Sequence, residues 1–267
     1  MEQKKWNRND RRPSARRAQE PAEAAENMLE GRNAVQEALA AGRPIDKLYI
    51  AAGETDRALA RLASMAREAG AAVVETDRRK LDQLSATGAH QGVIAMVAAH
   101  AYATVDEILE NAKSRGEAPL IVICDELSDP HNLGAIIRSA ECVGAHGVIV
   151  PERRAVGLTP AAVKASAGAI EHIKVARVVN MTRVIEMLKA RNIWTYALTM
   201  DGTDYEKVNF KGGVALVVGS EGEGISHLVL ENCDQKVSLP MAGHLDSLNA
   251  SVAAGVVMYH VLSSRRA

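Results

Sequence analysis

The chain of 267 residues contains three polar segments that each follow an apolar run and carry side chains able to do chemistry. The first spans residues 125–138 and contains Asn132 and Arg138. An amide side chain both donates and accepts hydrogen bonds, whereas a guanidinium can hold a phosphate or stabilise a developing negative charge. Asp129 and Pro130 are typical of the start of a helix, so a capped helix with a surface arginine is the competing interpretation.

The second segment, residues 219–224, reads GSEGEG and follows the apolar run VALVV. Its three glycines allow the backbone to turn sharply and to approach a ligand closely, beyond what an ordinary strand-to-helix turn requires. The glycine spacing differs from that of dinucleotide-binding and phosphate-binding loops, which argues against both kinds of nucleotide site. Because Glu221 and Glu223 would repel phosphate, we expect a neutral or cationic ligand here.

The third segment, residues 239–249, contains Ser247 and Asn249 and precedes a stretch rich in alanine and glycine. That stretch is expected to form a helix over residues 247–264, capped by Asp246 or Ser247. Its small residues allow another helix or another subunit to approach closely, although tight packing of a terminal helix would explain them equally well.

Alternating helical and strand-like patterns predict an α/β protein with two domains, residues 27–98 and 119–267, joined by a linker at 99–118. The first is expected to be a small α/β domain with about three strands. In the second, continuous apolar strands between helices predict a parallel sheet covered on both faces. Ligands of such sheets bind beyond the carboxyl ends of the strands, where the three polar segments begin. The strands of the second domain are expected at residues 119–124, 147–150, 173–176, 193–198, 214–218 and 235–239.

The net charge of −1 conceals an uneven distribution, which bears on whether RNA is a partner. Residues 1–18 carry seven Lys or Arg against two Asp or Glu, a net charge of +5, so the rest of the chain carries −6. Residues 1–26 are therefore predicted to be a disordered basic tail, either an arm for RNA phosphates or a solvated extension without a partner. Only eight residues are aromatic, which argues against a stacking platform for single-stranded nucleic acid.

The three cysteines, Cys124, Cys142 and Cys233, have no paired spacing and predict neither a disulfide framework nor a zinc site. We expect them to be buried free thiols in a reducing compartment. No apolar run reaches the roughly 18 residues of a membrane span, and no apolar segment of a secretory signal follows the basic N-terminus. The protein is therefore expected to be cytoplasmic, without a membrane or a metal as partner.

In this order, the three polar segments resemble the motifs of the SpoU/TrmH family of the SPOUT methyltransferase superfamily. The matching stretches are DPHNLGAIIRSAE, VVGSEGEGI and LPMAGHLDSLNASVAAG, all within residues 119–267. Residues 27–98 resemble the small ribosomal-protein-like α/β domain that binds RNA and precedes the catalytic domain in many members. The resemblance implies a parallel-sheet SPOUT domain with a C-terminal trefoil knot, and a homodimer whose interface lies beside the knot.

The resemblance also implies the chemistry, which is methyl transfer from S-adenosyl-L-methionine to a ribose 2′-hydroxyl of RNA. Carried over position by position, it implies a set of catalytic residues: Asn132, Arg138, Glu221, Ser247 and Asn249. The positions implied to hold the cofactor, largely through backbone groups, are Thr199, Gly219, Leu239, Met241, Ser247 and Leu248.

The segment MLEGRNAVQEAL, residues 28–39, resembles the opening of bacterial enzymes that methylate a guanosine ribose in 23S rRNA. That resemblance predicts 23S rRNA as the partner, with tRNA or another rRNA nucleotide as alternatives. A non-catalytic RNA-binding protein of ribosome assembly would instead show degenerate motifs, and a nicotinamide dehydrogenase would show the dinucleotide fingerprint.

Overall fold

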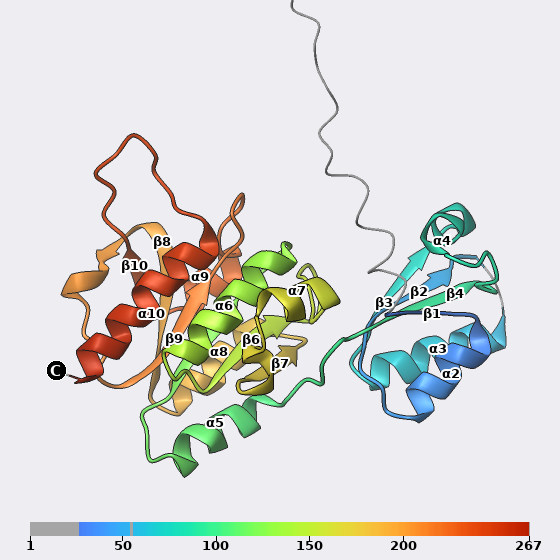
Figure 1. Ribbon diagram of the computed structural model, residues 1–267, viewed down its shortest axis with the longest axis horizontal. Coiled ribbons are helices and arrows are strands. Elements are labelled where there is room, and N and C mark those ends of the chain that lie inside the picture. The colour runs from blue at the N-terminus through green and yellow to red at the C-terminus, as the bar shows by residue number, and fades with distance from the viewer. Residues whose placement is uncertain (1–26, 54–55, 267) are drawn as a thin grey trace, which may run out of the picture.

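The structure is a computed structural model that describes residues 27–53 and 56–266. These residues form two bodies, each built on its own sheet and joined by an extended segment (Figure 1). We call residues 27–97 the N-terminal module and residues 105–266 the C-terminal module. The predicted basic tail, residues 1–26, lies outside the described residues.

The N-terminal module has a mixed sheet with strand order β1-β4-β2-β3, in which β2 and β3 are parallel and the other pairs antiparallel. Helices α2 and α3 lie on one face of this sheet and α4 lies on the other (Figure 1). The elements are β1 (Met28–Glu30), α2 (Arg32–Ala40), β2 (Ile45–Ala51), α3 (Arg57–Glu68), β3 (Ala72–Thr76), α4 (Arg78–Leu84) and β4 (Val93–Val97). The short strand β1 was not predicted, because three residues are too few to show a periodicity.

The C-terminal module has a sheet of six strands in the order β10-β8-β9-β5-β6-β7, and every neighbouring pair is parallel. This confirms the parallel sheet that the sequence predicts. Its elements are α5 (Val105–Ser114), β5 (Leu120–Cys124), α6 (Pro130–Cys142), β6 (Gly147–Pro151), α7 (Pro160–Ala165), β7 (Lys174–Val178), α8 (Met181–Ala190), β8 (Ile193–Asp204), β9 (Gly213–Val218), α9 (His227–Asn232), β10 (Gln235–Ser238) and α10 (Ala250–Arg266).

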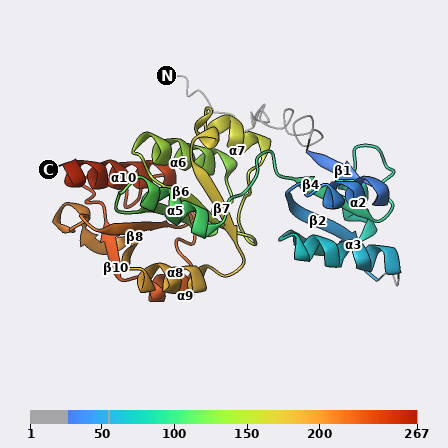
Figure 2. The ribbon, with the colours of Figure 1, turned by 90° about the horizontal axis from the view of Figure 1, so that it is seen from below.

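Helices cover both faces of the six-stranded sheet. Helices α6, α7 and α10 pack on one face, and α5, α8 and α9 pack on the other (Figure 2). Strand β5 supplies both cores, because Leu120 and Val122 point to the first face and Ile121 and Ile123 to the second. Alternation of apolar side chains on both faces is the reason the strands read as continuous apolar runs.

The C-terminal helix α10 is fixed at its end by Arg265. The guanidinium donates to four backbone carbonyls, those of Ala118 at 2.8 Å, Pro119 at 2.8 Å, Gly212 at 2.7 Å and Phe210 at 3.4 Å. Partial burial lowers the pKa of Arg265 from its ordinary value. This side chain therefore ties the end of the chain to the residues that enter β5 and β9.

Two predicted boundaries in the C-terminal module are wrong. Strand β8 continues to Asp204 instead of ending near residue 198, and α10 begins at Ala250 instead of 247. The end of β8 is exposed and lacks an apolar pattern, so its pairing with β10 depends on a contact distant in sequence. At that contact a Cβ on Gly202 would lie 2.5 Å from the backbone nitrogen of Val237, which leaves room only for glycine.

The cysteines are free, as expected, but the prediction that all three are buried is wrong. Cys142 is exposed, because it lies in the last turn of α6 away from the apolar stripe, and Cys233 is half-buried. Only Cys124 is fully buried, and burial raises the pKa of its thiol to about 12.

No helix in residues 27–53 or 56–266 combines the length and the apolar character that crossing a membrane requires.

The buried ring of His146 makes the stability of the C-terminal module depend on pH. Its Nδ1 accepts the N–H of Leu120 at 3.0 Å, and its Nε2 lies 3.0 Å from Glu117 Oε2. Burial lowers the pKa of His146 from its ordinary value of 6.5, although Glu117 opposes the shift. The folded state therefore favours the neutral ring, and the stability it contributes is present above pH 6.5 and is lost as the pH falls toward the lowered pKa.

We predict that the free energy of unfolding of the wild type falls more steeply than that of His146→Asn when the pH is lowered from about 7.5 to about 5.5. Asparagine places an acceptor near the position of Nδ1 but does not titrate in this range. Urea unfolding at each pH measures the difference, with the exposed His172→Asn as the control. Equal slopes for the wild type and His146→Asn would contradict this assignment.

Candidate functional site

The three polar segments singled out in the sequence meet at one place. They follow β5, β9 and β10, whose carboxyl ends point to the same edge of the parallel sheet. One side chain from each segment takes part in the contact: Asn132 at the start of α6, Glu221 in the loop after β9, and Asn249 just before α10. We call these three residues the amide–carboxylate triangle.

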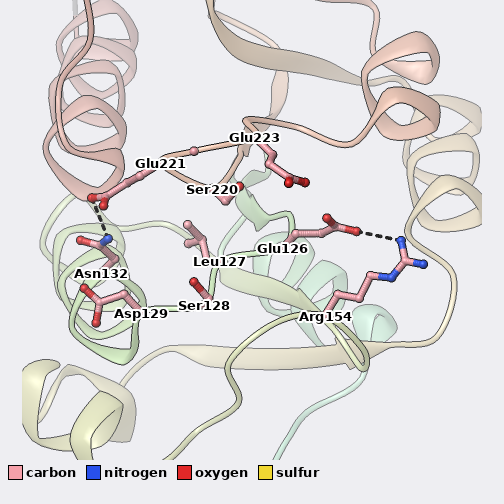
Figure 3. Close-up of a pocket in the computed structure, with 10 residues that line it drawn as sticks. Glu126, Leu127, Ser128, Asp129, Asn132, Arg154, Ser220, Glu221 and Glu223 are labelled. Carbon is pink, nitrogen blue, oxygen red and sulfur yellow. Dashed lines mark hydrogen bonds and ion pairs between the residues drawn. The ribbon is translucent and has the colours of Figure 1, made fainter.

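The triangle is closed by direct hydrogen bonds. Asn132 Nδ2 donates to Glu221 Oε1 at 3.0 Å, and Asn249 Nδ2 donates to Asn132 Oδ1 at 2.9 Å (Figure 3 shows the first of these). Asn249 Nδ2 also donates to Glu221 Oε1. Asn132 is buried, with 6% of its surface exposed, so its amide is fixed in orientation by these partners.

Asn249 is oriented from the other side by the helix that follows it. Its Oδ1 accepts the backbone N–H groups of Ser251 at 3.0 Å and Val252 at 3.3 Å, which is the geometry of a helix N-cap. The prediction that Asp246 or Ser247 caps this helix is therefore wrong. Asp, Ser and Asn are all good capping residues. Asn249 is the cap here because its amide also bonds to Asn132 and Glu221.

Helix α6 begins as the sequence predicts. Asp129 caps it by accepting the N–H of His131 at 2.9 Å, and Pro130 occupies the first helical position. The N-terminal ends of α6 and α10 both reach Glu221 through their asparagines. Because a helix N-terminus carries partial positive charge, the two helices favour a negative charge at this position.

The glycine-rich loop is held in one shape by its own backbone. Ser220 and Gly224 exchange two N–H···O bonds, each 3.0 Å long, and any Cβ on Gly219 would overlap the backbone of Gly224 and Ile225. Behind the loop, the buried Asp125 accepts the N–H of Ser226 at 2.8 Å. This contact links the loop after β9 to the end of β5.

A cleft of about 330 Å³ opens beside the triangle. Glu126 and Arg154 line one side of it as an ion pair, with Arg154 Nη1 3.5 Å from Glu126 Oε1, and Glu221 and Glu223 of the glycine-rich loop also line it (Figure 3). Asp125, Glu126 and Arg154 were not predicted from the sequence as members of the site. The two acidic residues directly after the apolar run LIVIC were the available signal, whereas nothing in the spacing marks Arg154.

Arg138 lies on the exposed side of α6, outside the buried stripe, as expected. Within the described part of the chain its guanidinium has no hydrogen bond or ion pair. It is thus placed six residues along the same helix from Asn132, with its donors available to another molecule. The exposed hydroxyl of Ser247 is likewise not joined to the triangle.

The segment 239–248 has the character that a planar, nearly neutral ligand requires. Among residues 27–53 and 56–266, none forms a hydrogen bond to its backbone N–H or C=O groups. Met241 and Leu248 are apolar yet 38% and 44% exposed. Free backbone donors and acceptors beside exposed apolar side chains fit an adenine ring, which needs both.

The other residues implied for the cofactor lie in β8 or directly after β9 and β10. Thr199 is half-buried in β8, Gly219 is buried at the end of β9, and Leu239 is half-buried after β10. These three strands are neighbours in the sheet. In the described residues, no group of three or more His, Cys, Asp or Glu side chains is arranged to hold a metal ion.

Comparison with known protein families gives two matches along the chain. Residues 119–259 match the model of the SpoU rRNA Methylase family, and residues 28–103 match that of the RNA 2′-O ribose methyltransferase substrate-binding domain. A TrmH family tRNA/rRNA methyltransferase of Bacillus subtilis is 47% identical over 236 residues, which cover 88% of this chain and 94% of the relative. A tRNA/rRNA methyltransferase of Mycolicibacterium vanbaalenii is 44% identical, over 88% of this chain and 76% of the relative.

Solved structures resemble the chain over most of its length. The SpoU methyltransferase AviRb from Streptomyces viridochromogenes, in complex with AdoMet, is 27% identical with a TM-score of 0.57, and the match covers 90% of both chains. An AdoMet-bound rRNA methyltransferase from Sinorhizobium meliloti is 25% identical with a TM-score of 0.53, over 88% of this chain and 85% of the other.

The two functions of Asn249 can be separated by substitution. Asn249→Ser keeps a good N-cap and removes the amide that donates to Asn132 and Glu221, whereas Asn249→Ala removes both. We predict that Asn249→Ala unfolds with a free energy about 0.5–2 kcal/mol lower than that of Asn249→Ser, measured by urea denaturation. If the two variants were equally stable, Asn249 would not be the cap of α10.

Proposed function

The chain belongs to the SpoU/TrmH family of RNA 2′-O-ribose methyltransferases, and from this premise we propose that it methylates a guanosine ribose in 23S rRNA. It uses S-adenosyl-L-methionine, as a family enzyme with AdoMet-bound structural neighbours. The relatives are named tRNA/rRNA methyltransferases, and we propose the RNA, the nucleotide and the roles of single residues in this chain.

The proposal rests mainly on the closed triangle of Asn132, Glu221 and Asn249. Arg138 lies on α6, the helix of Asn132, and has no partner among the described residues. Sequence resemblance implies a catalytic role for each of these residues, and they come from segments far apart in the chain. A non-catalytic protein with the same fold would be expected to show degenerate motifs, whereas Asn132, Glu221 and Asn249 are all present and bonded to one another.

We propose that the cofactor lies between β8 near Thr199 and the loops that follow β9 and β10. Backbone groups of Leu239, Met241 and Leu248 would hold the adenine, and Thr199, Gly219 and Ser247 would complete the site. The unpaired backbone and exposed apolar side chains of segment 239–248 support this placement. When bound, S-adenosyl-L-methionine supplies an electrophilic methyl group attached to a sulfonium. Carboxylates of the glycine-rich loop suit that positive charge.

Positioning should supply much of the rate, because the transfer is a displacement at carbon between two held reactants. The triangle fixes one side of the site, and Arg138 meets the RNA. A guanidinium remains protonated below about pH 12, so Arg138 holds an RNA phosphate or stabilises the developing alkoxide and is not the base. A phosphate of the substrate is the candidate that accepts the hydroxyl proton.

Guanosine is favoured by the groups that line the cleft. Guanine presents two adjacent donors on its Watson–Crick edge and two acceptors, O6 and N7, on its Hoogsteen edge. A carboxylate complements the first edge and an arginine the second. Glu126 and Arg154 bring both kinds of group to the cleft beside the triangle. The resemblance of residues 28–39 to enzymes for 23S rRNA supports the choice of RNA.

We also propose a homodimer that buries one face of α10. Val252, Val256 and Tyr259 are 51%, 39% and 51% exposed and lie on the side of the helix turned away from the core. An exposed apolar stripe of this kind on a well-packed helix is typical of an interface. The family resemblance places such an interface beside a trefoil knot, and we propose that the C-terminal segment is threaded in this way.

We propose that residues 27–98 bind RNA, that 99–118 connect the domains and that 119–267 carry out catalysis, with α5 of the connecting segment packed on the six-stranded sheet. The matched family segments, 28–103 and 119–259, support this division. The chain beyond residue 18 carries a net charge of −6, which is compatible with RNA binding by this protein. A cofactor site and a dimer interface need no net positive charge.

Incubation of the protein with labelled S-adenosyl-L-methionine and separate 23S rRNA fragments and tRNA tests the proposal, followed by mapping of the modified ribose. We predict 2′-O-methylguanosine in a 23S rRNA fragment. Methylation of tRNA alone, or of a ribose other than that of guanosine, would overturn the target proposed here.

We predict that Arg138→Ala retains affinity for S-adenosyl-L-methionine in calorimetry and loses most of its turnover. The loss follows because the guanidinium contacts the RNA and not the cofactor. Arg183→Ala is the matched control, since Arg183 is also exposed and lies on α8, across the sheet from α6. Near-normal turnover of Arg138→Ala would remove Arg138 from the mechanism.

A further inference from the structure

A buried ionic contact joins the two modules at a place that methyl transfer itself does not use. Arg177 lies near the carboxyl end of β7, the edge strand of the six-stranded sheet, and Asp46 lies in β2 of the N-terminal module. Their side chains are only 9% and 13% exposed, and Arg177 Nη1 donates to Asp46 Oδ1 at 2.5 Å.

Arg177 is bound to the N-terminal module by more than this ion pair. Its Nη2 donates to the carbonyl of Ile45 at 2.8 Å and to the carbonyl of Gly70 at 2.6 Å. A single side chain of the C-terminal module therefore contacts both β2 and the turn that precedes β3. The planar arrangement of guanidinium donors allows this, and a lysine could not make the same set of contacts.

The segment between the modules is part of the same contact. The Tyr102 hydroxyl donates to Asp46 Oδ1 at 2.6 Å and accepts the N–H of Leu158 at 2.8 Å, while the guanidinium of Arg177 lies 4.5 Å from the centre of its ring. The backbone N–H of Ala99 also bonds to the carbonyl of Leu158, at 2.8 Å. The linker is thus fastened along the C-terminal module.

Gly157 provides the space into which Asp46 fits. A Cβ at this position would lie 2.7 Å from the carboxylate of Asp46, closer than a carbon atom can stand without displacement. The backbone of Gly157 does not adopt the left-handed conformation, so alanine is excluded by the neighbour and not by the backbone. We call Asp46, Tyr102, Gly157 and Arg177 the intermodule junction.

The junction lies on the side of the sheet where the candidate site is. Arg177 is near the carboxyl end of its strand, as are the loops that carry the triangle. Strand β7 is two positions from β5 in the sheet, a separation of about 10 Å. The loop between β6 and α7 connects the two places, because Arg154 lines the cleft while Gly157 and Leu158 belong to the junction or bond to it.

We propose that the intermodule junction fixes the N-terminal module at a set distance and orientation from the methyl-transfer site, so that RNA held by that module presents one ribose to the cleft. Asp46, Tyr102 and Arg177 are then positioning residues that determine which nucleotide of a large RNA is reached. This inference rests on the proposed function, in which the N-terminal module binds the RNA.

Two variants open the junction in different ways. Removal of Arg177 alone would leave a buried unpaired carboxylate, whose pKa burial already raises, so Arg177→Met is combined with Asp46→Asn. Gly157→Ala instead keeps every charge and inserts a methyl group against Asp46. Arg191→Met is the matched control, because Arg191 forms an ion pair with Asp106 at 2.9 Å within the C-terminal module.

Hydrogen exchange of backbone N–H groups at the linker measures whether the junction is closed, independently of enzyme activity. In the wild type the N–H groups of Ala99 and Leu158 are bonded across the linker, and we expect them to exchange slowly. Both junction variants should exchange faster at these positions, with the thermal midpoint of the C-terminal module and the affinity for S-adenosyl-L-methionine unchanged. Exchange in Arg191→Met should match that of the wild type. Unchanged exchange in both junction variants would overturn the inference.

Methylation of two RNAs tests the positioning role. The probes are a 23S rRNA transcript, which can occupy both modules, and a short hairpin cut from it around the methylated nucleotide. We expect the junction variants to lose roughly ten-fold to a hundred-fold in kcat/KM on the transcript, mainly through KM, and to be near wild type on the hairpin. Equal losses on both RNAs, or none on the transcript, would overturn the inference. Failure of the proposed function differs from this, because the wild type itself would then methylate neither RNA.

Discussion

The geometry of the candidate site depends on one carboxylate, that of Glu221. It accepts hydrogen bonds from the amides of Asn132 and Asn249, which are 117 residues apart in the chain. In each amide both the oxygen and the nitrogen form hydrogen bonds within the protein. Asn249 caps α10 with its oxygen and donates with its nitrogen, and Asn132 donates to Glu221 while it accepts from Asn249. Because Asn132 is buried, removal of Glu221 or of Asn249 would leave one of its amide groups without a partner, which is more costly than the bond itself is stabilising. The loops after β5, β9 and β10 are therefore fixed relative to one another by side chains, and not by the sheet alone.

The site contains groups that are bonded within the protein and groups that are free to bind ligands. The triangle and the bonded glycine-rich loop are satisfied within the protein, whereas Arg138 and the backbone of segment 239–248 have no partner among the described residues. A site that holds its own framework rigid and leaves a guanidinium and a row of backbone groups free is suited to two ligands of different kinds. The cofactor and the RNA that the family uses are such a pair.

The sequence predicted the parts of the structure that depend on local pattern. The parallel sheet followed from strands such as LIVIC that are apolar on both faces, and the start of α6 from Asp129 and Pro130. It could not predict features that depend on distant contacts. Asp246, Ser247 and Asn249 are equivalent as caps until Asn132 and Glu221 are in place, and the exposed end of β8 is ordered by β10. The ion pair of Asp46 and Arg177 spans 131 residues and has no local signature. Catalytic roles came from the family motifs, and periodicity alone left them open.

A crystal structure of the protein with S-adenosyl-L-methionine would test most directly whether the triangle marks the site of methyl transfer. We predict that the adenine contacts the backbone of Leu239 and Leu248, and that the methyl group faces the space between Arg138 and the triangle of Asn132, Glu221 and Asn249. A cofactor bound elsewhere on the sheet, or one whose methyl group pointed away from an intact triangle, would contradict the account.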